Sequence, residues 1–248
     1  NETFKVVRNQ KYDINNIGEY SLTLQVTDSS NNVSAQKFLL KVVNKIVSSP
    51  SSNITTSYKD TFNTYKKENN KIGLDISKWQ GYIDFNKLLT NNVEFIMLRV
   101  GYQKGVKGIN EIDSYFDTNI KKINELKIPV GIYFYSYATS VDEAKEQALW
   151  VADKIKEYNI SLPVVFDFEN WSNFPSLNLS LHDINAITRT FLSTIKENGY
   201  EAMNYSSKYY LENIWDIEEY PVWLAHYTNQ TSYTGQYSMW QLCNNGKI

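Results

Sequence analysis

The sequence predicts an α/β barrel that follows a smaller all-β segment, and three observations lead to this expectation. From residue 72 onward, short apolar runs alternate with amphipathic helical patterns, which is typical of parallel strands joined by crossover helices. Residues 1–46 instead alternate apolar and polar side chains with a period of two, as half-buried strands do. A Ser-rich polar stretch separates the two patterns, so the chain is expected to contain two domains.

The N-terminal segment predicts a β-hairpin, with strands at residues 20–26 and 38–43 and a turn-forming cluster at residues 28–32. Gly18-x-Tyr20, Val26-Thr27-Asp28 and Asn32 resemble the C-terminal half of the immunoglobulin-like modules of bacterial surface proteins. A complete sandwich of this kind needs about 100 residues, so residues 1–46 are interpreted as a partial Ig-like β domain. Residues 47–70 are predicted to be a linker, and residues 71–248 the barrel domain.

The barrel domain is expected to contain five βα units followed by additional strands. The predicted strands lie at residues 72–76, 95–100, 130–137, 164–168, 202–205, 222–225 and 239–242. The predicted helices lie at residues 85–89, 115–126, 141–158 and 184–198. After about residue 200 the long helical patterns end, so the last strands are expected to be joined by loops. A right-handed series of this type closes naturally into a barrel.

The composition excludes several classes of function. A net charge of -2 and only three arginines among 25 basic residues argue against nucleic-acid binding, because such proteins carry a basic face. No apolar run approaches the roughly 20 residues that a membrane-spanning helix needs. Cys243 is the only cysteine, and His182 and His226 are isolated, so neither a metal site nor another cofactor is expected.

Aromatic residues are abundant, with 19 Tyr and 6 Trp in a total aromatic share of 15%. Flat amphipathic rings suit carbohydrate binding, because the C–H faces of sugars pack on them while the Tyr hydroxyls form hydrogen bonds. A tyrosine-rich core would give the same composition, so both interpretations stay open at this point.

Asp167 and Glu169 stand at the end of the fourth predicted strand. Residues two apart on a strand face the same side, with α-carbons about 6.6 Å apart. Val165, Asp167 and Glu169 are therefore expected to face the barrel interior, and Phe166 and Phe168 the helices. The carboxyl ends of barrel strands are where such folds keep their active sites.

Two carboxyls this close suit glycoside cleavage. Repulsion raises one pKa, so that one carboxyl stays protonated near neutral pH. The reaction needs an acid for the leaving oxygen and an anion for the oxocarbenium-like centre. The same pair could instead cap the next helix or bind a structural ion. Asp75, near the end of the first predicted strand with Ser77 on the same face, adds a third carboxylate and favours the catalytic interpretation.

The segment Gly73-Leu74-Asp75-Ile76-Ser77-Lys78-Trp79-Gln80-Gly81, with Ile83-Asp84-Phe85 after it, resembles the opening of the glycoside hydrolase family 25 lysozymes, the Chalaropsis-type muramidases. Residues 95–101, 117–119 and 130–135 are similar to the next segments of that family, and Asp167-x-Glu169 matches its catalytic pair. Asn204-Tyr205-Ser206, Val222-Trp223-Leu224-Ala225 and Trp240-Gln241 are similar to its later strands. The similarity runs in order from residue 72 to the end of the chain.

The resemblance implies a flattened TIM-like barrel that hydrolyses the β-1,4 bond from N-acetylmuramic acid to N-acetylglucosamine. Glu169 would be the general acid, and Asp167 would stabilise the developing cation or orient the substrate N-acetyl group. Asp75 would tune the pair or order water. The α-carbon spacing allows attack either by water or by the acetamide of the substrate. The implied partner is the glycan strand of peptidoglycan, and the implied location is secreted or cell-wall associated.

Seven further residues are candidates for substrate binding. Tyr133 and Tyr135 share a strand face with Tyr137 and could line a sugar groove or fill the barrel. Trp171 follows Glu169 at the barrel mouth, where it would suit a sugar platform. Arg99 could pair with a site carboxylate or form a surface ion pair. The remaining candidates are Tyr205, Trp223 and Gln241.

Two rival functions are compatible with the sequence. A chitinase-like barrel glycosidase also ends its fourth strand with Asp-x-Glu, but it normally carries another Asp two residues earlier, where this chain has Val165. A non-catalytic cell-wall binding module would keep the groove without turnover. The presence of Asp75, Asp167 and Glu169 together argues against the second rival.

The resembling family closes its barrel with an eighth strand that carries another acid, and residues 244–248 stand where that strand should begin. The strand is therefore expected to be missing as far as residue 248. Exposed strand edges recruit other strands, so another segment is expected to fill the position. The N-terminal hairpin of the same or a neighbouring chain is one candidate, which makes a strand-swapped dimer possible.

Overall fold

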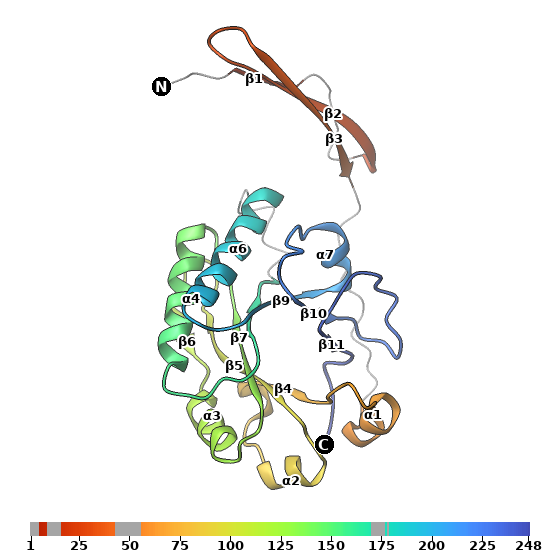
Figure 1. Cartoon of the computed structure of the whole chain (residues 1–248), viewed down its shortest axis with the longest axis vertical. Helices are drawn as coiled ribbons and strands as arrows, with labels where there is room; N and C mark the ends of the chain where they lie inside the picture. Colours follow the sequence, from red (N-terminus) through yellow and green to blue (C-terminus); the bar gives the residue numbers. More distant parts are fainter. Residues whose placement is uncertain (1–4, 9–15, 43–55, 170–176, 178) are drawn as a thin grey trace. The chain divides into compact units, whose positions relative to one another are not determined.

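The computed structural model describes residues 5–8, 16–42, 56–169, 177 and 179–248. The chain divides into two compact units, Asn1–Pro50 and Ser51–Ile248, and each is described by itself (Figure 1).

The N-terminal unit contains an antiparallel sheet of strands β1 (Lys5–Arg8), β2 (Gly18–Thr27) and β3 (Val33–Val42), in the order β1-β2-β3. The predicted hairpin is confirmed, because β2 and β3 pair in register from Gly18↔Val42 to Thr27↔Val33. Asp28 forms the turn by accepting hydrogen bonds from the backbone N–H groups of Ser30 and Asn32, both at 2.8 Å. The Ig-like identity of this sheet stays a prediction.

The second unit contains parallel strands in the order β11-β10-β9-β8-β7-β5-β4. Their bounds are β4 (Leu74–Ile76), β5 (Ile96–Gln103), β7 (Val130–Tyr135), β8 (Val164–Asp167), β9 (Ala202–Ser207), β10 (Val222–Ala225) and β11 (Met239–Gln241). A short strand β6 (Asn110–Ile112), which the sequence patterns did not predict, pairs antiparallel with β5.

Five βα units are present, as predicted. The helices α2 (Phe85–Thr90), α3 (Phe116–Glu125), α4 (Val141–Ile155), α6 (Leu181–Glu197) and α7 (Lys208–Asn213) follow β4, β5, β7, β8 and β9 in turn. Residues 226–238 then join β10 to β11, and no helix is assigned there. Side-chain caps fix where the longest helices begin: Ser140 accepts from the Glu143 N–H, and Ser180 forms a capping box with Asp183.

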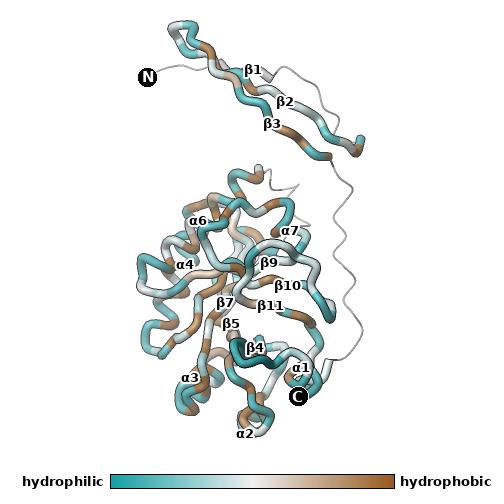
Figure 2. The backbone as a smooth tube through the Cα atoms, turned by 45° about the vertical axis from the view of Figure 1, so that its right-hand side comes forward, coloured by the Kyte–Doolittle hydropathy of each residue, from teal (hydrophilic) through white to brown (hydrophobic). Residues whose placement is uncertain are grey.

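The parallel sheet is buried on both faces, and alternate side chains of β8 and of Phe168 just after it lie on opposite faces. Val164, Phe166 and Phe168 belong to the large hydrophobic core that also contains helix residues such as Phe191 of α6. Val165 belongs to a smaller cluster with Met97 and other inward-facing side chains. The helices alternate hydrophobic and hydrophilic residues along their length, as helices with one buried face do (Figure 2). The expected facing of β8 is therefore confirmed.

Residues 58–65 correct the expected extent of the linker. They form helix α1 (Tyr58–Tyr65), capped by Ser57, whose side chain accepts from the Asp60 N–H. Tyr58 is only 4% exposed and packs in the barrel core, while its hydroxyl lies 3.0 Å from the Ile72 carbonyl. Its helical pattern was missed because α1 is mostly polar and buries few apolar positions. The part of the predicted linker at residues 47–55 lies outside the described residues.

Helix α1 contacts both ends of the strand series. The Tyr65 ring packs edge-on against Trp240 of β11, with ring centroids 5.8 Å apart, and Tyr58 bonds to residues beside β4. Lys247 adds a backbone pair with the segment before α1: its N–H donates to Thr56 and its carbonyl accepts from Tyr58, both at 2.8 Å. Among the described residues no strand lies between β11 and β4, so α1 and the segment around Lys247 cover part of this opening (Figure 1). The strand-swapped dimer stays a prediction.

Because α1 belongs to the barrel, Tyr58→Ala is expected to lower the free energy of unfolding by about 3 kcal/mol through the lost packing and hydrogen bonds. Lys59→Ala, an exposed change on the same helix, should shift it by less than about 0.5 kcal/mol. Urea denaturation of both variants measures the difference. Equal stability of the two would show that α1 is not part of the barrel core.

Candidate active site

Asp167 and Glu169 lie at the carboxyl end of β8. Asp167 is the last residue of the strand and is 7% exposed, and Glu169 follows it two residues later, partly buried. Asp167 is paired across the sheet with Tyr135 of β7 on one side and Tyr205 of β9 on the other. The strand therefore places Asp167 in the centre of the series, where neighbouring side chains exclude water.

The surroundings of Asp167 and Glu169 raise the pKa values of both carboxyls. Burial raises the pKa of Glu169 to about 7. Burial also raises the pKa of Asp167 well above its usual range, and repulsion from Glu169 adds to this, while Arg99 opposes it. Asp167 Oδ1 is buried and has no hydrogen-bond partner among the described residues, which is costly for a charged oxygen. The pair as a unit therefore retains a proton near neutral pH.

Asp75 is held by a hydrogen-bond network that joins the first and last strands. Its Oδ2 accepts from Gln241 Nε2 at 2.8 Å. Gln241 Oε1 in turn accepts from the hydroxyls of Tyr205, at 2.8 Å, and Tyr227, at 3.1 Å. Burial raises the pKa of Asp75, and the hydrogen bond from Gln241 opposes this effect. Because a carboxylate can only accept, Asp75 fixes which end of the Gln241 amide faces it.

The site contains a cavity of about 160 Å³. Its lining consists of Asp75, Tyr133, Asp167, Tyr205, Trp223 and Gln241. The rings pack edge-on: the Trp223 ring lies 4.8 Å from that of Tyr205 and 6.1 Å from that of Tyr133, measured between centroids. Tyr133 also forms a side-chain hydrogen bond with Ser77, and burial raises its pKa. The structure thus brings together two predicted carboxylates and four predicted binding residues in one cavity.

The other candidates are not among the residues that line this cavity. Tyr135 is partly buried, and its pKa is raised by burial and by repulsion from Asp167 and Glu169. Its ring contacts Tyr137 edge-on at 5.1 Å between centroids. Trp171 lies outside the described residues.

Arg99 forms a buried ion pair with Asp113, with Nη2 and Oδ2 2.7 Å apart. The contacts described for its guanidinium include no bond to Asp75, Asp167 or Glu169, so the suggested pairing with a site carboxylate is not found, and the ion pair is buried rather than on the surface. Asp113 also accepts from the backbone N–H groups of Lys78 and Tyr115. Arg99 still affects the site at a distance, because its charge lowers the pKa of Asp167.

Three further residues belong to the site, and the sequence patterns did not single them out. Tyr227 shares Gln241 with Tyr205. Burial raises the pKa of Tyr210, in α7, to about 12, and the nearby charge of Glu169 adds to this. Asp113 holds Arg99. No spacing rule for strands or helices could have found them, since each acts through a partner in another element of the fold; for the two tyrosines, the abundance of tyrosine was the only available signal.

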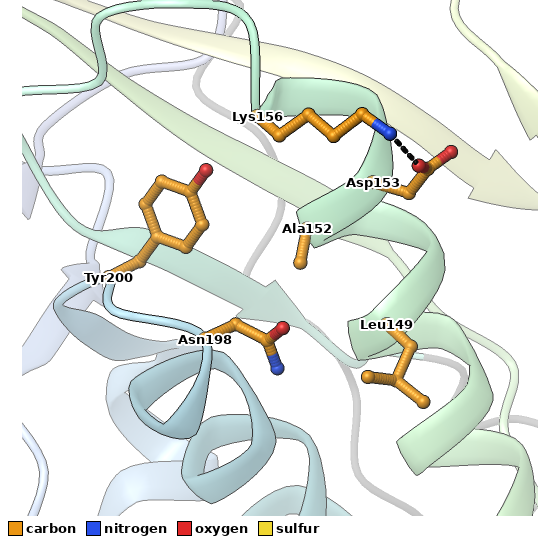
Figure 3. Close-up of a pocket in the computed structure, with 6 residues that line it drawn as sticks. All are labelled: Leu149, Ala152, Asp153, Lys156, Asn198 and Tyr200. Carbon is orange, nitrogen blue, oxygen red and sulfur yellow. Dashed lines mark hydrogen bonds and ion pairs between the residues drawn. The ribbon is translucent and has the colours of Figure 1, made fainter.

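A second cavity, of about 290 Å³, lies between α4 and the end of α6, lined by Leu149, Ala152, Asp153, Lys156, Asn198 and Tyr200 (Figure 3). Its carboxylate, Asp153, pairs with Lys156 at 2.7 Å, and hydrogen bonds from Lys156 and Lys154 lower its pKa. Tyr200 precedes β9, so the cavity lies at the amino ends of the strands, opposite the Asp167 end. A carboxylate with a lowered pKa cannot serve as a general acid near neutral pH.

Over the described parts of the chain, no group of three or more His, Cys, Asp or Glu side chains is arranged to hold a metal ion. The described helices likewise include none that is long and apolar enough to cross a membrane. What the site does offer is a pair of carboxyls with raised pKa values, a third carboxylate with a fixed amide partner, and a wall of aromatic rings. These are the groups that acid-assisted cleavage of a sugar acetal uses.

Curated proteins of similar sequence include two that cover more than half of this chain. YegX, an uncharacterized protein of Escherichia coli (strain K12), is 28% identical over 158 residues, covering 62% of this chain and 56% of its own. The autolytic lysozyme of Clostridium acetobutylicum is 22% identical over 179 residues, covering 71% of this chain and 51% of its own. The chain thus spans about half the length of these curated relatives.

Solved structures share the fold. The modular autolysin LytC of Streptococcus pneumoniae, solved in complex with a synthetic peptidoglycan ligand, matches with a TM-score of 0.61 and 25% identity, covering 89% of this chain and 52% of LytC. The spore cortex lytic enzyme SleM of Clostridium perfringens matches with a TM-score of 0.64 and 21% identity, covering 74% and 64%. The model of the glycosyl hydrolases family 25 matches residues 74–248, which include every described site residue. The chain belongs to glycosyl hydrolases family 25.

Proposed function

We propose that this protein is a muramidase that hydrolyses the β-1,4 bond between N-acetylmuramic acid and N-acetylglucosamine in peptidoglycan. The observation that carries the proposal is the buried pair of Asp167 and Glu169, whose raised pKa values keep one proton on the pair near neutral pH. The peptidoglycan ligand of LytC supports the choice of polymer.

In the proposed reaction, Glu169 is the general acid and donates its proton to the leaving glycosidic oxygen. Asp167 is the anion that stabilises the oxocarbenium-like centre or orients the N-acetyl group. Asp75, fixed by Gln241, tunes the pair or orders the attacking water. Tyr133, Tyr205 and Trp223 line the cavity and suit a sugar ring, because aromatic faces pack against sugar C–H groups. Tyr135 and Arg99 are proposed to contribute to substrate binding from outside the cavity lining. Trp171 is proposed as a sugar platform at the cavity mouth.

The proposed working place is the cell wall, with the protein secreted or wall-associated and with glycan strands as its partner. The N-terminal sheet is proposed to be part of an Ig-like module. Such modules are common on bacterial surface proteins, and this location would agree with a wall polymer as substrate.

Digestion of purified peptidoglycan tests the proposal. The expected result is a rise in reducing sugar with N-acetylmuramic acid at the new reducing end, identified after borohydride reduction. N-acetylglucosamine at that end would replace the muramidase assignment by a glucosaminidase, and cleavage of chitin in place of peptidoglycan would favour the chitinase-like rival. Binding without any release of reducing sugar would make the protein a wall-binding module.

The configuration of the first product separates the two routes of attack. Direct attack by water inverts the anomeric centre, whereas attack by the substrate acetamide followed by water retains it. Proton NMR of the product during the first minutes of reaction distinguishes the two anomers before they equilibrate.

A further inference from the structure

Two aromatic side chains that follow the strand of Asp75 are far more exposed than the other aromatic residues that the structure describes in the barrel. Trp79 is 79% exposed and Tyr82 is 85% exposed. Both follow β4, the strand that carries Asp75, in the segment that contains the short 3-10 helix η1 (Lys78–Gln80). Large apolar rings in full contact with water indicate a binding surface when they gather in one place.

The segment is held firmly against the site. Ser77 caps η1 in a capping box with Gln80, and Ser77 also bonds to Tyr133, which lines the catalytic cavity. The backbone N–H of Lys78 donates to Asp113 at 2.9 Å. Trp79 is therefore fixed near the carboxyl end of β4, at the same end of the strands as Asp167, without being buried.

Lys78 places a positive charge beside this surface. Its Nζ lies 5.3 Å from the centroid of the Trp79 ring and 4.5 Å from that of Tyr102, and it donates to the Tyr102 hydroxyl at 3.1 Å. An ammonium has three N–H donors, and this hydrogen bond uses one of them. The Tyr102 hydroxyl in turn donates to Glu111 at 2.8 Å, so a bound anion would share the charge of Lys78 with this carboxylate. Trp79 remains 79% exposed with Lys78 beside it, and the surface can therefore receive a flat group next to a positive charge.

We propose that Trp79, Tyr82 and Lys78 form a sugar subsite outside the catalytic cavity that binds a β-1,4-linked N-acetylated glycan bearing a carboxylate. The inference rests on the proposed function. The subsite would bind the sugars of the glycan strand that lie outside the catalytic cavity. Trp79 and Tyr82 stack on sugar faces, and Lys78 pairs with the carboxylate of an acidic sugar such as the lactyl ether of muramic acid. Three peptide units separate the two rings, so their α-carbons are at most about 11 Å apart, a span suited to consecutive sugars.

The test measures binding separately from turnover. In the Glu169→Gln protein, which should bind but not cleave, calorimetry is carried out with peptide-free peptidoglycan glycan strands and with N-acetylglucosamine oligomers of equal length. Trp79→Ala is expected to weaken binding of the strands roughly three- to tenfold. Trp79→Phe should recover most of the affinity, and Leu149→Ala, an exposed apolar residue on α4, should leave it unchanged.

Lys78 is tested by its effect on selectivity. The parent should prefer the carboxylate-bearing strands, Lys78→Met should reduce this preference about two- to fivefold, and Lys78→Arg should keep it. An unchanged preference in Lys78→Met would overturn the acidic part of the proposal, and unchanged affinity in a folded Trp79→Ala protein would overturn the subsite. If the wild-type protein cleaves peptidoglycan while Trp79→Ala binds normally, the subsite fails and the proposed function stands. If no cleavage occurs but binding depends on Trp79, the subsite stands and the function fails.

Discussion

Replacing Glu169 by Gln is expected to reduce kcat on peptidoglycan by at least about 10²–10⁴-fold, the usual contribution of a general acid. The amide has nearly the same shape as the carboxyl but cannot transfer a proton to the leaving oxygen. Burial raises the pKa of Glu169 to about 7, so the wild-type rate should also fall as the pH rises above about 7. Initial rates of reducing-sugar release measure both effects.

If Glu169 had only a structural role, replacing it by Gln would destabilise the folded protein, whereas its raised pKa predicts no such loss of stability. A carboxyl whose pKa is raised on folding destabilises the folded state as the pH rises from its unfolded pKa, about 4.3, towards its folded pKa, by at most about 4 kcal/mol. Glu169→Gln removes this penalty, so above pH 7 the variant should be at least as stable as the wild type. Near-normal turnover in the folded variant would remove Glu169 from the mechanism.

Replacing Asp167 by Asn is expected to be comparably severe, because a neutral amide cannot balance the positive charge that develops at the anomeric carbon. A loss of about 10²–10⁴-fold in kcat is expected, with a smaller change in KM. Leu149→Ala, on the outer surface of α4, serves as the control for expression and folding. Retention of normal kcat in Asp167→Asn would contradict the paired-carboxyl mechanism.

The pH profile of Asp167→Asn carries a second, independent signal. In the wild type, the active pair holds one proton: a second proton inactivates it on the acid side, and loss of the last one inactivates it on the alkaline side. Without the Asp167 charge, Glu169 titrates free of repulsion, so the alkaline limb of the residual activity should move to lower pH. The acid limb that Asp167 causes should disappear. An alkaline limb that does not move would show that the two carboxyls do not interact, and a shift to higher pH would contradict repulsion between them.

The sequence predicted the parts of the site that depend on strand periodicity. Because side chains alternate along a strand, the order Val165, Phe166, Asp167 already placed the acid on the face opposite Phe166, and the two clusters on either side of β8 confirm it. The βα order was predictable for the same reason, since apolar runs and helical faces have distinct periods. Both features are local and are therefore visible in a short stretch of chain.

Contacts between distant segments could not be predicted in this way. Asp75 and Gln241 are 166 residues apart in the chain, yet their side chains form a direct hydrogen bond. Arg99 of β5 pairs with Asp113, which directly follows β6. Helix α1 was also missed, although Tyr58, Phe62 and Tyr65 recur at helical spacing, because it is only eight residues long and otherwise polar; its stability comes from the packing of these rings against the barrel. Tertiary packing decides such cases over local propensity.

Asp75 and Asp167 lie on two sides of the site that differ in how easily they move. Asp167 lies in a strand that is paired on both sides, so moving it requires breaking several backbone hydrogen bonds at once. Strands β4 and β11 are each three residues long and stand at the two ends of the series; each pairs with one neighbouring strand of the parallel series, and the Asp75–Gln241 hydrogen bond links them across the site. Low-energy opening concentrates where few backbone bonds must break. Asp167 is therefore held more rigidly than Asp75, and we expect the Asp75 side of the site to be the one that yields when a bulky polymer binds.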